Sequence, residues 1–350
     1  MSDLSSFSLP ALARHVTSPT RPPESLGGIH TFVDMFAGIG GFHLAAAGLG
    51  MKCVYACDVD EEARRAYEHN YGVRPAGDIS RVPAADVPDH DLFCAGFPCQ
   101  PFSIIGKRRG FADIRGTLFF EIIRILEVKR PRAVLLENVK QLRSNDGGRT
   151  LERIVEALEG LNYHVSWRVL NALNYGLPQK RERILIAAMQ DPFTEFPWPE
   201  GGVPMKPLGD ILEPNPDPRH FVSERIRRSR QKAHTSKHSP GIWHENKAGN
   251  VSSYPYSCAL RAGASYNYLL VDGKRRLTPR EMLRLQGFPE SFEIVCNLSQ
   301  ARKQAGNAVP VPLVLAGLRG IISVARTAQA QKIGSRSFSV CKVHSSLNYA

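Results

Sequence analysis

The residues best able to do covalent chemistry lie in a loop between two prolines, Pro98-Cys99-Gln100-Pro101. An apolar run from Leu92 to Ala95 predicts a short buried strand just before this loop. Gly96 and Pro98 end the strand, so Cys99 is predicted at its carboxyl end, where ligands bind in open α/β sheets. A thiol held there is a candidate nucleophile. Taken alone, an inert buried cysteine is the better interpretation, because free cysteines are usually buried.

Three further charged side chains could share that edge of the sheet. Glu137 directly follows a second apolar run, 133–136, so two adjacent strand ends could place a carboxyl and a thiol in one pocket. Arg181 and Arg183 are two residues apart and point the same way if the segment is extended. The alternatives are a helix-capping role for Glu137 and ordinary surface salt bridges for the arginines.

A glycine-rich stretch from Asp34 to Phe42 stands between a predicted first strand, 31–36, and a predicted first helix. Glycines let the backbone approach a ligand closely, and a helix N-terminus offers unpaired N–H groups. Asp58, at the end of the second strand, could accept hydrogen bonds from ribose hydroxyls. These features alone leave open a dinucleotide-dependent oxidoreductase and a purely structural turn.

The elements that must position these residues alternate along the first half of the chain. Strand-like runs and helical patterns follow one another at a spacing that predicts an α/β fold with a mostly parallel sheet covered on both faces. The predicted strands are 31–36, 53–57, 92–95, 133–136, 165–170 and 184–189, and the predicted helices are 44–47, 61–71, 117–128, 150–161 and 313–324. Thr278 is expected to cap another helix, with Pro279 in its first turn.

The composition suits a protein that binds a polyanion. Lys and Arg number 45 against 33 acidic residues, a net charge of +12, and basic side chains supply most non-specific affinity for nucleic acids. The sequence shows neither an export signal nor a membrane-length apolar run. Seven cysteines without a C-x-x-C pair indicate reduced thiols in a cytoplasm. Cys53 and Cys57 could be imagined as metal ligands, but their strand-like surroundings favour sheet packing, and we predict no metal site.

Changes in composition and periodicity along the sequence predict a division into domains. Residues 191–276 are rich in Pro, Gly, His and basic residues with little periodicity, unlike the regular stretches on either side. We therefore predict a flexible arm at 1–28, a catalytic and cofactor-binding domain at 29–190 and an irregular second domain at 191–276. The chain is then expected to return to the first domain at 277–330 and to end in a loose tail, 331–350.

Taken together, the motifs resemble those of the cytosine-C5 DNA methyltransferases of bacterial restriction-modification type. The resemblance covers about 30–190 and 258–322, and six motifs occur in the family's order. These are Asp34 to Phe42, Gly96 to Gln100, Glu137 to Val139, Gln179 to Arg183, Arg280 to Pro289 and Gly306 to Val309. The fold implied is a Rossmann-like methyltransferase domain that uses S-adenosylmethionine, with a smaller target-recognition domain at 191–276.

The resemblance assigns catalytic roles to four residues. Cys99 would add as a thiolate to C6 of cytosine, which makes C5 nucleophilic toward a sulfonium methyl. Glu137 would hydrogen-bond the N3 and N4 edge of the base. Arg181 and Arg183 resemble the pair that contacts the base and the phosphate near the nucleophile.

The resemblance also assigns a binding site for S-adenosylmethionine. Phe36, Gly38 and Gly40 would face the methionine and adenosine, with Asp58 on the ribose, Val59 beside it, Asp78 and Ile79 on the adenine, and Asn307 closing the site. Two positions depart from the commonest pattern, Asp58 where many members have Glu and Val59 where some have Trp. We expect weaker or shifted adenosine contacts without loss of binding. At the Ala259-Leu260-Arg261-Ala262 segment the family usually has Thr first, so one contact is expected to be lost.

The expected partner is double-stranded DNA, from which the target cytosine must be flipped into the pocket. We predict a mobile lid at 103–115, and a recognition segment from about 206 to 276 that contacts phosphates and bases. The candidate DNA contacts are Ser103, Lys107, Arg108, Arg109, Arg227, Arg228, Arg230 and Arg261. We expect a monomer in the bacterial cytoplasm, associated with the nucleoid. A restriction endonuclease that acts on the same site would be a cognate enzyme without being a physical partner. A tRNA cytosine-C5 methyltransferase, a nicotinamide-dependent oxidoreductase and a catalytically silent DNA-binding relative remain as alternatives.

Overall fold

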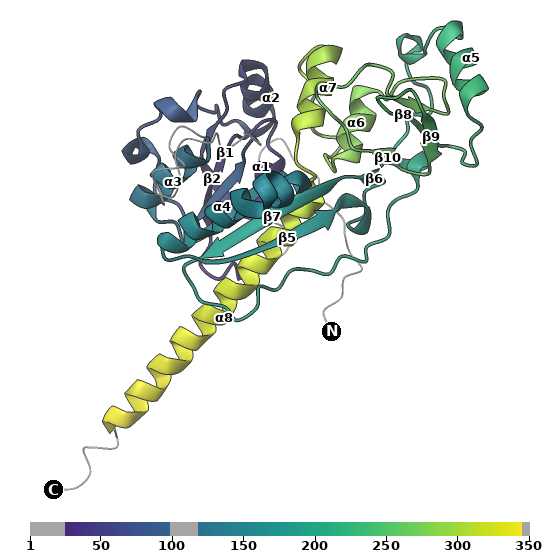
Figure 1. Ribbon diagram of the computed structural model, residues 1–350. Coiled ribbons are helices and arrows are strands. Elements are labelled where there is room, and N and C mark those ends of the chain that lie inside the picture. The colour runs from purple at the N-terminus through teal and green to yellow at the C-terminus, as the bar shows by residue number, and fades with distance from the viewer. Residues whose placement is uncertain (1–24, 99–117, 345–350) are drawn as a thin grey trace, which may run out of the picture.

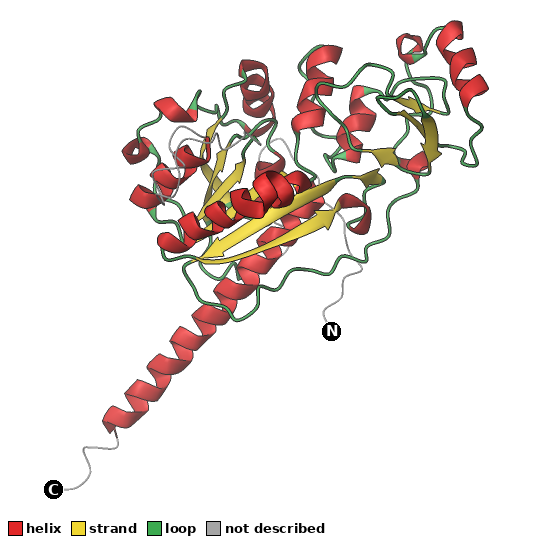
Figure 2. Cartoon of the chain, viewed as in Figure 1, coloured by secondary structure: helices red, strands yellow, loops and turns green. Residues whose placement is uncertain are grey.

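The computed structural model describes residues 25–98 and 118–344, and its chain forms two lobes (Figure 1). The larger lobe contains the main sheet with α1 to α4, and the smaller lobe contains α5 to α7 with β8 to β10. Figure 2 shows how much more loop the small lobe contains than the large one. Cys99 and the predicted lid, including Ser103, Lys107, Arg108 and Arg109, lie outside the described residues.

A six-stranded sheet with the order β2-β1-β3-β4-β7-β5 forms the centre of the large lobe. The strands are β1 (Thr31–Met35), β2 (Lys52–Cys57), β3 (Leu92–Gly96), β4 (Ala133–Val139), β5 (His164–Asn171) and β7 (Glu182–Met189). β1 to β4 are parallel, whereas β7 runs antiparallel to both β4 and β5. The predicted α/β class is confirmed, and the mostly parallel sheet has this one reversed strand.

Helices cover both faces of the sheet because its inner strands are apolar on both sides. Leu92 and Cys94 pack into one core together with residues of α1 (Gly41–Gly48) and α8 (Val311–His344). Phe93 and Ala95 point the other way, into a core formed with α3 (Leu118–Lys129) and α4 (Arg149–Gly160). α2 (Glu61–Tyr71) lies beside β2 and is capped by Asp60. The predicted helices near these positions are confirmed, with shifted ends.

The small lobe is built from short elements. These are α5 (Glu224–Ala233), β8 (Ile242–Glu245), β9 (Val251–Tyr254), β10 (Ser257–Cys258), β11 (Leu269–Val271), α6 (Pro279–Leu285) and α7 (Leu298–Asn307). β10 pairs with β6 (Gln179–Lys180), which joins the lobes. Thr278 caps α6 as predicted, in a capping box with Glu281. Elsewhere in the described residues, short 3₁₀ turns lie at Ile79–Arg81, Ala84–Asp86, Ala172–Asn174, Leu208–Asp210 and Pro218–His220. The segment Lys140–Gly148 contains 3₁₀ turns separated by a kink at 145–147.

Contacts of the chain on either side of the predicted second domain, 191–276, show which lobe each segment lies on. After residue 191 the chain stays on the large lobe, where Phe196 is buried against Gly320 of α8 and the Trp198 indole donates to Ser166. α6 and α7, which begin the predicted return segment 277–330, lie in the small lobe (Figure 1). The buried ion pair between Arg275 and Glu281 fastens α6 there at 2.8 Å. Composition does not predict the packing of Phe196 on Gly320 or of Trp198 on Ser166, since these contacts join residues distant in sequence.

The two chain ends also differ from the sequence-based prediction. Residues 25–28, expected in the arm, are held because Leu26 is buried and Arg132 donates to the Gly27 carbonyl. The backbone of α8 continues through 331–344, where a loose tail was predicted. The helical stretch Leu298–Lys332 contains an 18-residue window apolar enough to span a membrane, but 89% of that window is buried inside the protein.

Candidate active site and DNA interface

The glycine-rich loop turns sharply after β1 and leaves its backbone open. Phe36, Gly38 and Gly40 all have positive φ, at 56°, 54° and 82°. A Cβ on Gly38 would meet no atom within 4 Å, so space lies over the backbone there. α1 begins after Gly40 without a side-chain cap, which leaves its first N–H groups available to a ligand. The loop therefore has the form expected of a cofactor cradle.

Two tyrosines of α2, one helical turn apart, pack against this loop. The Tyr71 hydroxyl donates to the carbonyls of Ile39 and Gly40, at 3.2 and 3.1 Å. A Cβ on Gly40 would lie 2.2 Å from the Tyr71 ring and 3.0 Å from the Tyr67 ring. Gly40 is thus required both by its positive φ and by this close packing. The sequence analysis did not select Tyr71, because its role arises only when α2 packs against the loop.

Asp58 fastens the glycine-rich loop to the end of β2. Its Oδ2 accepts from the Gly38 N–H at 2.7 Å, and its Oδ1 accepts from the Asp60 N–H at 2.8 Å. Each carboxylate oxygen has a second lone pair, so ribose hydroxyls can still be accepted. Burial raises the pKa of Asp58, and these two N–H donors oppose the shift. Val59, next to it, is 76% exposed.

The remaining predicted cofactor residues lie around the same edge but differ in availability. The Asp78 side chain caps its own turn by accepting from the Ser80 N–H at 2.9 Å, which lowers its pKa. The Ile79 side chain is buried in the core, so only its backbone is available to an adenine. Asn307 is exposed at the end of α7.

We expect Asp58→Asn to weaken binding of S-adenosylhomocysteine by about tenfold, because charge-assisted hydrogen bonds are roughly twice as strong as neutral ones. Asp58→Ala should weaken binding further, since the Gly38 and Asp60 N–H groups lose their acceptor as well. Isothermal titration calorimetry measures both effects. The exposed Asp89→Asn exchange is the control. Equal affinity for wild type and Asp58→Ala would contradict the assignment.

The second predicted cluster forms where β3 and β4 end side by side. Gly96 pairs with Glu137 across the two strands. A Cβ on Gly96 would lie 3.4 Å from Glu137 Oε2, so the carboxyl faces the start of the loop that carries Cys99. Asn138 donates its side-chain N–H to the Phe97 carbonyl at 2.9 Å and anchors that loop. Asn138 has no evident role in the sequence motif. Its role becomes visible only through the contact with Phe97, which follows the neighbouring strand β3.

Glu137 is nearly buried and has one charged partner. Arg183 Nε lies 2.7 Å from its Oε1. Burial raises the pKa of Glu137, although the guanidinium groups of Arg183 and Arg181 pull it down. A carboxyl with a raised pKa can hold a proton and donate it in a hydrogen bond to a ring nitrogen. The arrangement therefore fits the predicted role at N3 of a cytosine.

Arg181 does not lie where the sequence-based prediction placed it. It is buried, and its two terminal nitrogens donate to the carbonyls of Leu260, Gly306 and Ala308, at 2.7, 3.0 and 2.8 Å. Burial lowers the pKa of this guanidinium to about 9, and it stays charged at neutral pH. Its terminal nitrogens are engaged, so it joins the two lobes and is not free to bind a phosphate. The alternation of Arg181 and Arg183 in sequence could not reveal the three carbonyls, which come from distant segments.

The arginines of the basic run at α5 differ in exposure. Arg227 and Arg228 are exposed on this helix, and both pair with Glu224 at 2.8 and 2.9 Å. Arg230 is buried, pairs with Glu245 and donates to the Asn267 carbonyl. The Arg230 guanidinium therefore holds parts of the small lobe together, and its DNA contact stays a prediction. A lone charge pattern does not distinguish these cases.

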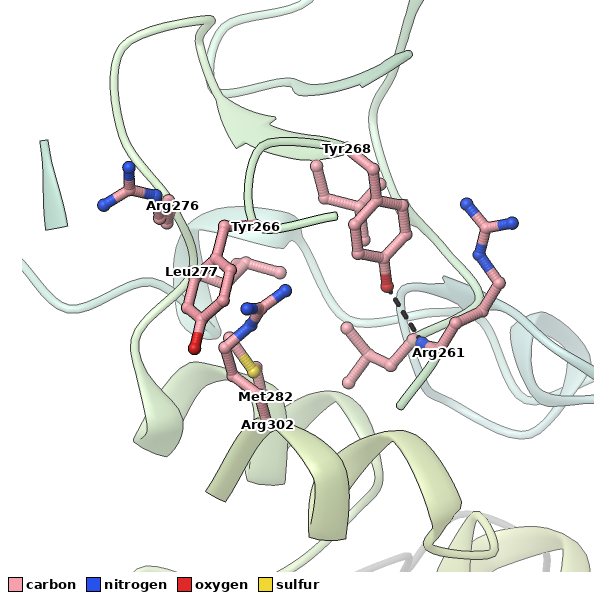
Figure 3. Close-up of a pocket in the computed structure, with 9 residues that line it drawn as sticks. Arg261, Tyr266, Tyr268, Arg276, Leu277, Met282 and Arg302 are labelled. Carbon is pink, nitrogen blue, oxygen red and sulfur yellow. Dashed lines mark hydrogen bonds between the residues drawn. The ribbon is translucent and has the colours of Figure 1, made fainter. Parts of the chain in front are cut away.

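A shallow cavity on the small lobe gathers arginines that sequence patterns did not connect (Figure 3). Arg261 is exposed, with its guanidinium 4.7 Å from the centre of the Tyr268 ring. Arg302 lies 3.6 Å from the centre of the Tyr266 ring, and Arg276 donates to the Asn267 side chain. The lining residues include no acid. This face therefore attracts anions.

The Rossmann-like sheet and the open glycine-rich loop beside the Asp58 carboxylate are features of the α/β class of methyltransferases. Comparison with known proteins makes the assignment specific. The C-5 cytosine-specific DNA methylase profile matches residues 30–323, and the chain belongs to this family. The protein is thus a DNA (cytosine-5-)-methyltransferase.

Individual relatives agree with the family assignment. The Type II methyltransferase M.NgoBI of Neisseria gonorrhoeae is 51% identical over 306 residues, which cover 87% of this chain and 96% of that protein. The Type II methyltransferase M.HaeII of Haemophilus aegyptius is 52% identical over 81% of this chain and 90% of its own length. Among solved structures, the Dnmt2 methyltransferase of S. pombe covers 84% of this chain and 98% of its own, with a TM-score of 0.64 and 24% identity. That likeness supports the fold alone.

Proposed function

We propose that this enzyme transfers a methyl group from S-adenosylmethionine to C5 of a cytosine flipped out of duplex DNA, as part of a restriction-modification system. One observation carries the proposal. The Glu137 carboxyl, paired with Arg183, faces Gly96, three residues before Cys99. A thiol and a protonatable carboxyl at adjacent strand ends are what addition to a pyrimidine ring requires.

In the proposed reaction, the Cys99 thiolate forms a bond to C6 while Glu137 donates a hydrogen bond to N3. The electron pair of the C5–C6 double bond then becomes available at C5 for attack on the methyl. S-adenosylmethionine supplies an electrophilic sulfonium methyl when bound. A base removes the C5 proton, the C5–C6 double bond re-forms and the thiolate leaves. The pair Glu137–Arg183 keeps its geometry throughout, because both side chains stand on paired strands.

The residues around the glycine-rich loop fit this cofactor. The space over Gly38 and the uncapped start of α1 suit the amino-acid part of the cofactor. Asp58 would accept the ribose hydroxyls, and Phe36, Gly40, Asp78, Ile79 and Asn307 would complete the site. The exposed Val59 side chain offers an apolar contact in place of an aromatic one. Burying that contact with the cofactor would contribute to binding.

The small lobe is proposed as the target-recognition module, with Arg261 as a phosphate contact. A plot of the logarithm of the DNA association constant against the logarithm of salt concentration has a negative slope. We expect Arg261→Met to make this slope about 0.9 less steep, the change for one lost phosphate contact. Arg230→Met should instead lower the melting temperature, because it leaves Glu245 without its partner, and should leave that slope unchanged. Fluorescence anisotropy of labelled duplex over a salt series tests both. An unchanged slope in Arg261→Met would remove this residue from the interface.

The remaining parts of the proposal concern the setting of the enzyme. It acts as a monomer on DNA in the bacterial cytoplasm. A restriction endonuclease that cuts the same site would be its functional counterpart. The predicted lid, with Ser103, Lys107, Arg108 and Arg109, would close over the flipped base. Turnover that stays unchanged when Arg108 and Arg109 become alanine would remove the lid from the mechanism.

Two measurements test the proposed function. Purified enzyme with tritium-labelled S-adenosylmethionine should label duplex DNA and leave unmodified tRNA unlabelled. Bisulfite sequencing of DNA from cells that express the protein should show 5-methylcytosine at one recurring sequence. Labelling of tRNA alone would favour the alternative of a tRNA cytosine-C5 methyltransferase. Failure to bind S-adenosylmethionine would favour the alternative of a nicotinamide-dependent oxidoreductase. Binding of DNA without methylation would indicate the silent relative.

A further inference from the structure

We propose that α7 links the cofactor site to the DNA-reading loop, with Lys303 and Gln304 as positioning residues that make the two ligands bind cooperatively. This inference rests on the proposed function, because it assumes that the glycine-rich edge holds the cofactor and the 260–268 loop meets DNA. Neither residue was selected by its sequence pattern. Both gain their role from what α7 contacts at its two sides.

One side of α7 contacts the cofactor edge. Lys303 Nζ lies 2.6 Å from Asp60 Oδ2, and the Gln304 side chain donates to the Glu62 carbonyl at 3.1 Å. Asp60 is also the cap of α2, and its own N–H donates to Asp58. One carboxylate group therefore separates Lys303 from the residue proposed to bind the ribose. The pair with Lys303 lowers the pKa of Asp60 and keeps it charged.

The other side of α7 contacts the recognition loop. Arg302, next to Lys303, donates to the carbonyls of Ala264 and Ser265 at 3.4 and 3.2 Å, and its guanidinium covers the Tyr266 ring. Figure 3 shows this guanidinium beside the Tyr266 ring. Tyr268 in turn accepts the Arg261 N–H at 2.9 Å. Arg302 thus orders the loop that presents Arg261.

The end of α7 is fixed against the same loop. A Cβ on Gly306 would lie 2.4 Å from the Ala262 nitrogen, so the two backbones are in direct contact. The buried Arg181 guanidinium bonds the carbonyls of Leu260 and Gly306 at once. Gln286 donates to the Ala305 carbonyl at 2.6 Å. Movement of α7 therefore carries the loop with it, since close packing transmits displacement.

This connection predicts reciprocal coupling between the ligands. A cofactor that engages Asp58 orders the Asp58–Asp60 turn, which holds Lys303 and sets α7 for the loop. DNA that binds an already ordered loop meets a smaller entropic cost. By linkage, each ligand must raise the affinity for the other by the same factor. Ordering of a shared element, rather than contact between the ligands, is the source of this cooperativity.

The test measures binding without turnover in the full-length protein. The DNA is an unmethylated duplex that contains the target sequence found by bisulfite sequencing. Its dissociation constant is determined by fluorescence anisotropy, with and without saturating S-adenosylhomocysteine. We expect about a tenfold tighter DNA complex in wild type, within the usual range of coupling. Lys303→Met should reduce the factor about threefold, as for a partly exposed ion pair, and Lys303→Met with Gln304→Met should bring it close to one. The affinity for each ligand alone should change little.

The controls separate this inference from a general loss of structure. Lys52→Met removes an exposed lysine of β2 and should keep the full coupling factor. Asp60→Asn keeps a good helix cap but removes the charge, and should resemble Lys303→Met. Failure of wild type to bind either ligand overturns the proposed function together with this inference. Binding of both ligands with no coupling in wild type, or with the same factor in the double variant, overturns this inference alone.

Discussion

A Cys99→Ala variant is expected to lose methyl transfer by at least about 10⁴-fold, the scale seen when a covalent nucleophile is removed. Without a sulfur–C6 bond, C5 of the aromatic ring is too weak a nucleophile to take the methyl. The variant should still bind both ligands, since Asp58 and Arg261 are unchanged. Transfer of tritium to duplex DNA measures the loss, and bisulfite sequencing of expressing cells confirms it.

The matched control for this experiment is another thiol. Cys258 is half-buried on β10, and burial raises its pKa, so it is not a thiolate at neutral pH. Cys258→Ala should therefore keep near wild-type turnover. Cys99→Ser tests the chemistry in a second way, because a hydroxyl of similar size is a far poorer nucleophile at neutral pH. Methylation that survives in Cys99→Ala would remove covalent catalysis by this residue from the mechanism.

The second large effect is expected at Glu137. Glu137→Gln should lower kcat by about 10²- to 10⁴-fold, the usual range for a lost general acid, with a smaller change in KM. The amide can still donate a hydrogen bond to N3, but it cannot hand over a proton as the ring becomes electron-rich. Single-turnover methylation of duplex DNA isolates this step from product release.

The role of Glu137 also predicts how kcat/KM changes with pH. The useful form of Glu137 is protonated, and burial raises its pKa, so its contribution is present at low pH and is lost as the pH rises through the raised pKa. The Cys99 thiolate has the opposite dependence, which predicts a bell-shaped profile for kcat/KM. Glu137→Gln should abolish the alkaline limb only. Glu182→Gln, at a neighbouring exposed pair with Lys140, should keep the full profile, and an unchanged alkaline limb in Glu137→Gln would contradict the assignment.

Several features could be predicted because they depend on local order along the chain. The apolar runs before Gly96 and Glu137 predicted β3 and β4, and their alternation with helices predicted a sheet covered on both faces. The glycine-rich turn after β1 needs positive φ at Gly38 and Gly40, which glycine tolerates best. Six motifs in order predicted the family, which the profile over residues 30–323 confirms.

Tertiary structure decided which arginines are free to bind a ligand. Four arginines look alike in sequence but have different surroundings. Arg181 lies among carbonyls and Arg183 pairs with Glu137. Arg230 is buried with Glu245, whereas Arg261 is exposed. Charge patterns cannot separate them, because a guanidinium can donate hydrogen bonds to carbonyls, carboxylates and phosphates alike.

By itself, then, the sequence determined the kind of chemistry and the order of the elements, since residue types and spacing carry both. It did not determine the lobe boundary, the support of the glycine-rich loop by Tyr71, or the place of α7 between the two ligand sites. Each depends on contacts between residues far apart in the chain, such as Lys303 with Asp60 and Gly306 with Ala262. Only the packing of the folded chain brings those residues together.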